Sequence, residues 1–308
     1  MNRHTTSGRW GLGISLALFT TFIWGLIPVI LKVLIQSLDA YTITFYRFFI
    51  AAVLSAAAVM YRSDFRSMIR GIRGMYWILA LAAILGFTGS YILYPLALAY
   101  VSPSVAQVLN QVSFIFMLVG GVVFFKERLG FVQLIGGIVL FGGMALFFNE
   151  RFDELLSGSG ALYSGILLIV AGAACLALYT LVQKQLLQIL PSEGIMLLVY
   201  LAGTALIFPM SRPERIVELT ASQAGLLILS APVTLIAFVS LSESLHHLEV
   251  NRVGMILAIV PLATVGAMAV CAALFPDLLQ QEGLNGLSIL GAVLVVVGVM
   301  MGSFRKSR

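Results

Sequence analysis

The sequence predicts an all-α membrane protein with ten transmembrane helices in two inverted five-helix repeats. Three observations lead to this prediction: the composition, a succession of long apolar segments, and a match between the two halves of the chain. Of the 308 residues, 60% are hydrophobic and only 10% are charged, and the mean hydropathy is +1.05. Soluble domains of this length carry more charge, so we expect a chain that crosses a bilayer many times.

Ten apolar segments follow one another along the chain. Each is close to the roughly 20 residues that an α-helix needs to cross about 30 Å of hydrocarbon. They cover residues 12–31, 40–60, 76–98, 104–125, 131–148, 161–183, 194–210, 222–242, 253–274 and 286–304. The first segment follows Arg3 and Arg9, as a signal peptide would, but it is long and contains Trp24, Gly25 and Pro28. We therefore expect it to persist as the first helix.

The two halves of the chain match at a nearly constant offset. The matches pair Gly13 with Gly165, Lys32 with Lys184, Glu127 with Glu282, Leu129 with Leu284, Gly136 with Gly291 and Gly143 with Gly298. Because each half holds an odd number of segments, the second half must enter the membrane from the opposite side. Many secondary transporters are built in this way and bind their substrate between the repeats. We expect a first repeat at 1–148, an outer linker at 149–160, a second repeat at 161–304 and a cytoplasmic tail at 305–308.

Basic residues are distributed unevenly between the two sides of this topology. The side of the N-terminus holds thirteen of them: Arg3, Arg9, Arg62, Arg66, Arg70, Arg73, Lys126, Arg128, Lys184, Arg252, Arg305, Lys306 and Arg308. The other side holds Lys32, Arg151, Arg212 and Arg215. Since basic loops resist translocation, we expect both termini in the cytoplasm. The arginine-rich loop after the second helix is then topogenic, and no nucleic-acid partner is expected.

Polar residues form a stripe along one face of the fourth predicted helix. The stripe recurs at helical spacings of three and four and consists of Ser104, Gln107, Asn110, Gln111 and Phe114. It can be the wall of a water-filled cavity. Alternatively, its amides can bind neighbouring helices and stabilise their packing by about 1 kcal/mol each.

Aromatic residues with a polar tip are scattered over several predicted helices: Trp24, Tyr46, Tyr91, Tyr94 and Tyr179. Such rings can stack on an organic solute and hydrogen-bond to it, but they also anchor helices at membrane interfaces. Trp24 and Tyr91 lie deep in their segments, which favours the cavity, whereas the positions of Tyr61 and Tyr200 favour the interface.

Three ionisable residues in or beside predicted spans are candidates for coupling or gating. Arg47 lies inside the second segment, where its long side chain can reach the membrane surface, pair with another residue or contact an acidic solute. Glu243 and His247 are four residues apart at the end of the eighth segment and could share a proton. A polar helix end without a functional role explains the same pair.

Prolines and glycines mark the helices expected to bend or to pack closely. Pro28, Pro95, Pro232 and Pro261 interrupt backbone hydrogen bonding within predicted spans, which makes these helices candidate gates. Glycines spaced two turns apart predict close packing of the fifth and tenth helices. These glycines are Gly136, Gly143, Gly291 and Gly298.

Several motifs in the sequence resemble those of one transporter family. They are W-G-L-I-P-V-I-L-K from Trp24, F-Y-R-F-F from Phe45, A-Y-V-S-P-S-V-A-Q-V-L from Ala99, F-F-K-E-R-L from Phe124, S-E-S-L-H-H-L-E-V-N-R-V from Ser242 and I-V-P-L from Ile259. Together they resemble the EamA-type branch of the drug/metabolite transporter superfamily over essentially the whole chain. The halves differ in two respects. Ser113 stands where the second half has Pro261, and about seven more residues separate Pro261 from Glu282 than separate Ser113 from Glu127.

The resemblance implies a transporter of the bacterial inner membrane with a central cavity. Carried over by position, its substrate-binding residues would be Trp24, Tyr91, Gln107, Asn110, Tyr179 and Ser240, and the polar stripe adds Gln111.

The leading hypothesis is export of a small polar or amphipathic metabolite, such as an amino acid, by alternating access, with proton coupling as an option. A multidrug efflux transporter is the first alternative. A non-transporting membrane assembly protein or an intramembrane enzyme is the second, but the spans hold no convergent set of catalytic groups. The expected partners are a small-molecule substrate and the lipid bilayer, in a monomer or weak homo-oligomer. No cofactor or metal is expected, because Cys175 and Cys271 both fall within spans and form no metal or disulfide motif.

Overall fold

The computed structural model describes residues 9–62, 76–126, 130–151, 160–248 and 250–303, and these are helical or loop, without a strand. The predictions about Glu127 and Leu129, the basic loop after the second helix and the tail lie outside the described residues. The α-helices are α1 (Trp10–Leu34), α2 (Ala40–Arg62), α4 (Tyr76–Leu98), α5 (Pro103–Asn110), α6 (Val112–Phe125), α7 (Phe131–Phe147), α9 (Gly160–Leu186), α10 (Ser192–Ile207), α11 (Ala221–His247), α12 (Val250–Leu257), α13 (Val260–Leu274) and α14 (Gly286–Ser303). Short 3₁₀ turns are η1 (Asn149–Arg151), η2 (Phe208–Met210) and η3 (Pro213–Glu218).

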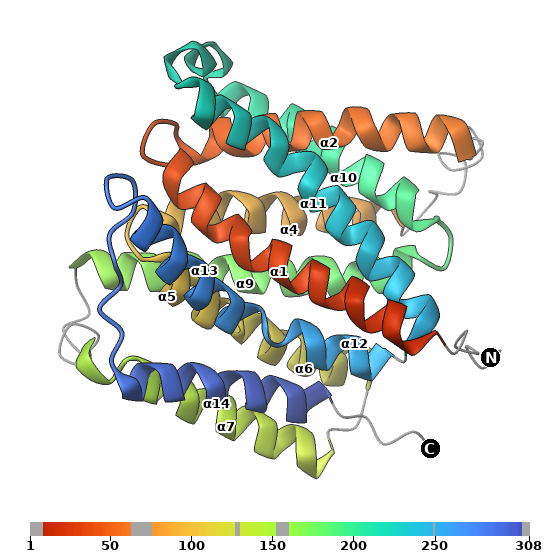
Figure 1. Cartoon of the computed structure of the whole chain (residues 1–308). Coiled ribbons are helices and arrows are strands. Elements are labelled where there is room, and N and C mark those ends of the chain that lie inside the picture. Colours follow the sequence, from red (N-terminus) through yellow and green to blue (C-terminus); the bar gives the residue numbers. More distant parts are fainter. Residues whose placement is uncertain (1–8, 63–75, 127–129, 152–159, 249, 304–308) are drawn as a thin grey trace.

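The helices form a bundle in which they run side by side (Figure 1). In the described residues, eight spans are long and apolar enough to cross a membrane, and the apolar helices α7 and α14 are shorter. The chain is therefore an all-helical membrane protein, as the composition predicts. Helix α1 begins and α14 ends at the same end of the bundle, on the right of Figure 1. We call this the near end, and the opposite end, where α1 stops, the far end.

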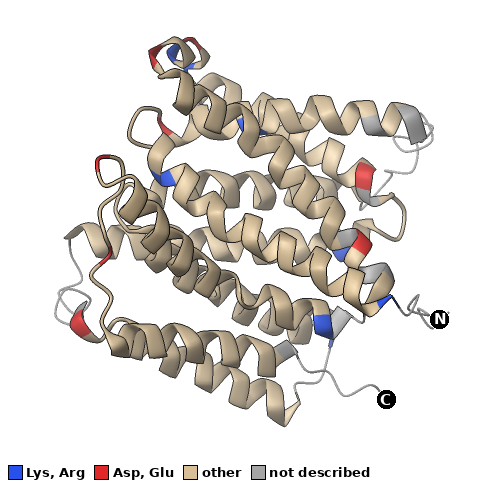
Figure 2. Cartoon of the chain, in the orientation of Figure 1, with Lys and Arg blue, Asp and Glu red and all other residues tan. Residues whose placement is uncertain are grey.

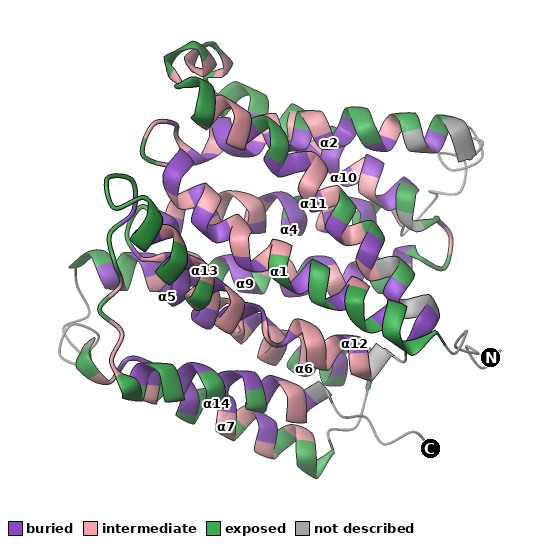
Figure 3. Ribbon diagram, in the orientation of Figure 1, coloured by how far each residue is buried: buried purple, intermediate pink, exposed green. Residues whose placement is uncertain are grey.

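Charged residues lie mainly toward the ends of the helices, and most of the bundle between them is uncharged (Figure 2). The outward surface between the ends is apolar. On α4, Trp77, Ile78, Leu81 and Leu85 are each more than half exposed, and exposed positions run along the outer helices (Figure 3). Large apolar side chains on the outside are unfavourable in water and favourable in lipid, so this surface fits a bilayer.

The fourth and ninth predicted helices each contain a break that the sequence analysis did not predict, although Pro103–Phe124 and Arg252–Leu274 are each long and apolar enough to be one span. The break after α12 has a clear cause, because Pro261 in the first turn of α13 has no N–H to donate to the preceding turn. The break at Gln111, between α5 and α6, has no proline. There the backbone switches to tighter bonds, from Gln111 N to Val108 O and from Phe114 N to Gln111 O.

Helices α7 and α14 approach so closely that only glycine fits between them, as the glycine spacing predicts. A Cβ added at Gly136 would lie 2.6 Å from the carbonyl oxygen of Gly298, and one at Gly143 would lie 2.8 Å from that of Gly291. The pairing runs in opposite directions along the two helices, so they are antiparallel. Close backbone contact of this kind maximises van der Waals packing within a membrane.

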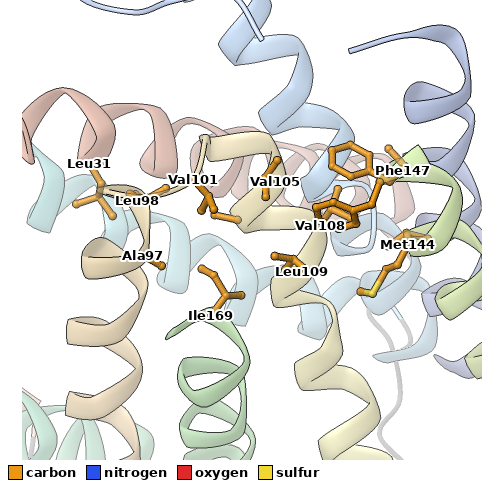
Figure 4. Close-up of a cluster of buried hydrophobic side chains, with 14 of the residues drawn as sticks. Leu31, Ala97, Leu98, Val101, Val105, Val108, Leu109, Met144, Phe147 and Ile169 are labelled. Atoms are coloured by element: carbon orange, nitrogen blue, oxygen red, sulfur yellow. The ribbon is translucent and has the colours of Figure 1, made fainter. Parts of the chain in front are cut away.

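The other helices pair across the two halves of the chain. Helix α1 packs on α11 and α13, α9 packs on α4 and α6, and α2 packs on α10. The largest cluster of buried hydrophobic side chains includes Leu34, Leu98, Val101 and Val105 at the far end, together with residues of α7, α9 and α14 (Figure 4). Both halves of the chain thus contribute to the packing that closes the far end.

Candidate functional site

A cavity of about 750 Å³ lies in the middle of the bundle. Its lining residues come from α1, α2, α4, α5, α6, α9, α10, α11, α12, α13 and α14 and from the breaks in the fourth and ninth helices. A cavity of this volume is in the range that holds a small organic ligand. The predicted binding residues can therefore be compared with its lining.

Most of the predicted residues lie around this cavity. Those among its lining are Trp24, Arg47, Tyr91, Gln107, Asn110, Gln111 and Tyr179. Ser240 is buried in α11 but is not among the lining residues, so the structure gives no support for its contact with a solute. The assignment of these side chains to substrate binding remains a prediction, because the structure holds no ligand.

Aromatic rings form one part of the cavity wall. Phe87 and Tyr91 of α4 pack with ring centroids 4.6 Å apart, and Phe87 lies 4.7 Å from Tyr179 of α9. A second pair lies on other helices, where Trp24 of α1 meets the edge of Phe238 of α11 at 5.3 Å. Such rings offer flat apolar surfaces to a solute, and their polar tips can form hydrogen bonds.

Amide side chains of the predicted stripe form another part of the cavity wall, and they differ in whether they have a hydrogen-bond partner. The hydroxyl of Tyr94 donates a hydrogen bond to Oε1 of Gln107 at 2.7 Å, which joins α4 to α5. The side chains of Asn110 and Gln111 have no hydrogen-bond partner among the described residues, although both line the cavity. Gln107 therefore packs helices together and faces the cavity, whereas the next two amides keep their donors and acceptors available.

Arg47 lies on α2 and is only 5% exposed. Its Nη2 atom lies 3.4 Å from Oγ1 of Thr234 on α11, and its guanidinium carbon lies 5.2 Å from the ring centroid of Tyr91. The side chain therefore points into the bundle and does not reach the membrane surface, which excludes the snorkelling alternative in this structure.

Polar contacts join segments at the far end, in addition to the hydrophobic cluster. Lys32 Nζ, near the end of α1, donates to the carbonyl oxygens of Leu98, the last residue of α4, and of Val101 in the following loop. Oε1 of Glu282, from the loop before α14, accepts a hydrogen bond of 3.2 Å from the backbone N–H of Ser104 in the first turn of α5. A carboxylate at this position stabilises the N-terminus of a helix.

The cavity lining comes close to both ends of the bundle. At the far end it includes Leu31 and Pro95, each three residues before the end of its helix, α1 or α4. It also reaches the near end. Gln183, one of its lining residues, lies three residues before the end of α9, about 5 Å along the helix. Gly254 lines it from α12, four residues after that helix begins, about 6 Å along it. Buried clusters at this end are separate, one around Val182 and Leu186 and another around Ala17 and Leu248. The near half of the bundle thus has no single cluster that joins all the helices in the described residues.

The predicted pair Glu243 and His247 lies at the near end of α11, outside the cavity lining. Nε2 of His247 is 3.3 Å from Oε1 of Glu243. His247 also packs beside α1, because a Cβ at Gly13 would lie 2.8 Å from its Cβ. The pair forms as the spacing predicts, but the structure does not connect it directly with the cavity.

Sequence reasoning missed several residues near the cavity. Thr234, Phe238, Met196 and Phe87 line it but carry no sequence signal that separates them from other apolar or hydroxyl residues of a span. Tyr200 was expected at the membrane interface, and this is wrong. It is 2% exposed and packs against Phe87 with ring centroids 5.3 Å apart. The signal that could have pointed to it is Arg47, because an arginine deep inside a predicted span needs polar neighbours such as tyrosines.

With the bundle and the cavity described, comparison with known proteins identifies the family. The EamA-like transporter family model matches residues 11–149 and again 163–304. The chain belongs to the EamA-like transporter family. The resemblance found in the sequence motifs is thereby confirmed, and the family and its named relatives are membrane transporters.

Individual relatives are known as transporters without an assigned substrate. An uncharacterized transporter of Haemophilus influenzae is 38% identical over 182 residues, which cover 59% of this chain and 58% of that protein. The uncharacterized inner membrane transporter YhbE of Escherichia coli is 33% identical over 183 residues, or 59% of this chain and 57% of that one. The match thus spans little more than half of either relative.

A solved crystal structure, described only as that of a protein, has the same fold. It matches with a TM-score of 0.62 and 17% identity over 94% of this chain and 95% of that chain. At this identity the likeness concerns the fold alone.

Proposed function

We propose that this chain is a secondary transporter that exports a small polar or amphipathic metabolite, such as an amino acid, by alternating access. The observation that carries the proposal is the cavity of about 750 Å³ in the middle of the bundle, which helices from both halves of the chain line. Its aromatic and amide walls suit a solute with apolar and polar parts.

We further propose that the bundle consists of ten transmembrane helices in two inverted repeats, at 1–148 and 161–304, with a linker at 149–160 and a tail at 305–308. The two matches to one family model support this division. Exchange of the halves turns the α1 and α11 contact into the α9 and α4 contact, and both are present. It likewise exchanges the pair Gly136 and Gly298 with the pair Gly291 and Gly143. Reciprocal contacts of this kind are the mark of a two-fold relation.

The location we propose is the bacterial inner membrane, with both termini and the near end in the cytoplasm. The excess of basic residues in the loops on the N-terminal side supports this orientation. One relative is named an inner membrane transporter. We propose that in this orientation the cavity opens to the cytoplasm, from which an exporter loads its solute.

We propose Glu243 and His247 as the candidate site of proton coupling, because His247 Nε2 and Glu243 Oε1 lie 3.3 Å apart. Export of cationic drugs gains no support from the cavity. Among its described lining residues the formally charged one is Arg47, which is itself a cation.

The test is solute flux in proteoliposomes that contain the purified protein. Labelled amino acids and related metabolites are loaded inside or outside, with and without a pH gradient. The proposal predicts saturable flux of at least one solute, and a pH gradient that changes its rate would establish coupling. Absence of protein-dependent flux across a broad panel would contradict it.

A further inference from the structure

We infer that Arg47 is an anion-binding residue of the cavity and that the preferred solute is an amphipathic carboxylate whose acidic group pairs with this arginine. That the bound solute is also the transported one rests on the proposed function. The binding site itself rests on the contacts of Arg47, on the charges of the cavity wall and on the rings beside it.

The depth of Arg47 makes its charge costly. It is the eighth residue of α2 (Ala40–Arg62), so it lies about 10 Å along the helix from its far-end start, inside the apolar part of the bundle. The side chain is 5% exposed. A charged group removed from water in this way is unfavourable unless a partner compensates it.

The partners that the structure provides compensate the charge incompletely. Thr234 Oγ1 accepts at a long 3.4 Å from Nη2, and Tyr91 offers its ring face at 5.2 Å. The Nε–H is buried and has no hydrogen-bond partner among the described residues. No carboxylate pairs with Arg47 in the described part of the chain, and no aspartate or glutamate is among the described residues that line the cavity. A guanidinium with unused donors therefore borders the cavity.

A carboxylate is the group that matches the unused hydrogen-bond donors of Arg47. The planar guanidinium presents parallel N–H groups that match the two oxygens of a carboxylate, and such charge-assisted pairs are about twice as strong as neutral hydrogen bonds. A cationic group would be repelled, and a neutral amide would leave the arginine charge unbalanced. A buried arginine should therefore bind acidic solutes with higher affinity than their neutral analogues.

Rings beside Arg47 suit the apolar body of such a solute. Tyr91 packs against Phe48 at 5.1 Å and against Phe87 at 4.6 Å. Phe87 and Tyr91 both line the cavity, and Tyr179 continues the same wall. A molecule with its carboxylate at Arg47 can therefore place an apolar group on this aromatic wall, which is why we specify an amphipathic acid.

The experiment measures binding by tryptophan fluorescence in nanodiscs, without a gradient. Trp24 lines the cavity, whereas Trp10 and Trp77 are exposed, so the substitutions Trp10→Phe and Trp77→Phe leave Trp24 as the only reporter. The probes are phenylacetate and 4-methylpentanoate, their neutral analogues phenylacetamide and 4-methylpentanamide, and the cation phenethylamine. We expect each carboxylate to bind about tenfold or more tightly than its amide, and phenethylamine to bind least well.

Variants of Arg47 test whether its charge causes the preference for carboxylates over amides. Arg47→Gln should remove the preference for carboxylate over amide, and Arg47→Lys should retain part of it, because lysine keeps the charge without the paired donors. Arg215→Gln is the matched control. It removes a cation of η3 whose side chain is 32% exposed and pairs with Glu218, and it should leave the preference unchanged. The unliganded Arg47→Gln protein should melt at the same temperature as the reporter protein or higher, since it loses an incompletely paired charge.

Three results would overturn the inference. One is equal affinity for carboxylates and amides, and another is no detectable binding of either carboxylate. The third is a preference that survives Arg47→Gln while the melting temperature falls, which would assign Arg47 to packing. Because the assay needs no flux, a failure of transport in proteoliposomes would leave this result readable, and flux insensitive to the solute's charge would leave the transport proposal standing.

Discussion

Neighbouring side chains of the polar stripe on the fourth predicted helix differ in role, since some pack helices together and others line the cavity. Gln107 accepts a hydrogen bond from Tyr94 and so ties two helices together. Asn110 and Gln111, one turn further along, face the cavity without a partner among the described residues. The two interpretations of the stripe therefore apply to different residues of it, and the sequence pattern alone treats all of them alike.

Replacement of Asn110 or Gln111 should lower flux without changing stability, whereas replacement of Tyr94, the partner of Gln107, should lower stability. Asn110→Ala and Gln111→Ala should each lower flux about fivefold, the effect of losing one hydrogen bond of about 1 kcal/mol to the solute, with an unchanged melting temperature. Tyr94→Phe should lower the free energy of unfolding by about 1 kcal/mol, because it breaks an internal bond. Proteoliposome flux and thermal unfolding measure both.

Ser164→Ala is the control for these variants. Its hydroxyl is exposed and bonds only within α9, to Gly160 O, so neither flux nor stability should change. Unchanged flux in Asn110→Ala and Gln111→Ala would place both amides with Gln107 in packing.

At the scale of the helices, local sequence predicts where each helix lies but only some of its breaks. The ten apolar segments predict helices at the observed places, because hydrophobic length is a local property. The break at Pro261 has a local cause. The break at Gln111 has none, since it arises from i to i−3 bonds within residues 104–119, which contain neither proline nor glycine. The setting of Arg47 was not predictable, because Tyr91, Tyr200 and Thr234 come from three other helices and only tertiary packing brings them together.

The glycine contact between α7 and α14 gives a test at this scale. Gly143→Ala should destabilise the protein by about 1–3 kcal/mol, because its Cβ would lie 2.6 Å from Val295 N and force the helices apart. Gly142→Ala, at the adjacent position, has nothing within 4 Å of the new Cβ and should be neutral or stabilising, since alanine favours the helix. Thermal unfolding in detergent compares the two, and equal melting temperatures would contradict the close packing.

At the scale of the whole molecule, the two ends of the bundle differ in how their buried side chains cluster. At the far end, the hydrophobic cluster and the contact of Glu282 with Ser104 join helices from both halves, and Lys32 ties α1 to the end of α4. At the near end, buried clusters remain separate. Alternating access requires that the far-end contacts break while the halves approach each other at the near end, so the far-end cluster should become accessible during transport.

Cysteine accessibility in vesicles of known orientation tests this central claim most directly. In a Cys175→Ala and Cys271→Ala background, Thr180→Cys reports on the cavity and Val105→Cys on the far-end cluster, where Val105 is 0% exposed. A membrane-impermeant maleimide should label Thr180→Cys from the near side only and leave Val105→Cys unlabelled from both sides. A transported solute, or Glu282→Gln, should raise far-side labelling of Val105→Cys. Equal labelling of Thr180→Cys from both sides, or an unreactive Val105→Cys during measured flux, would contradict the account.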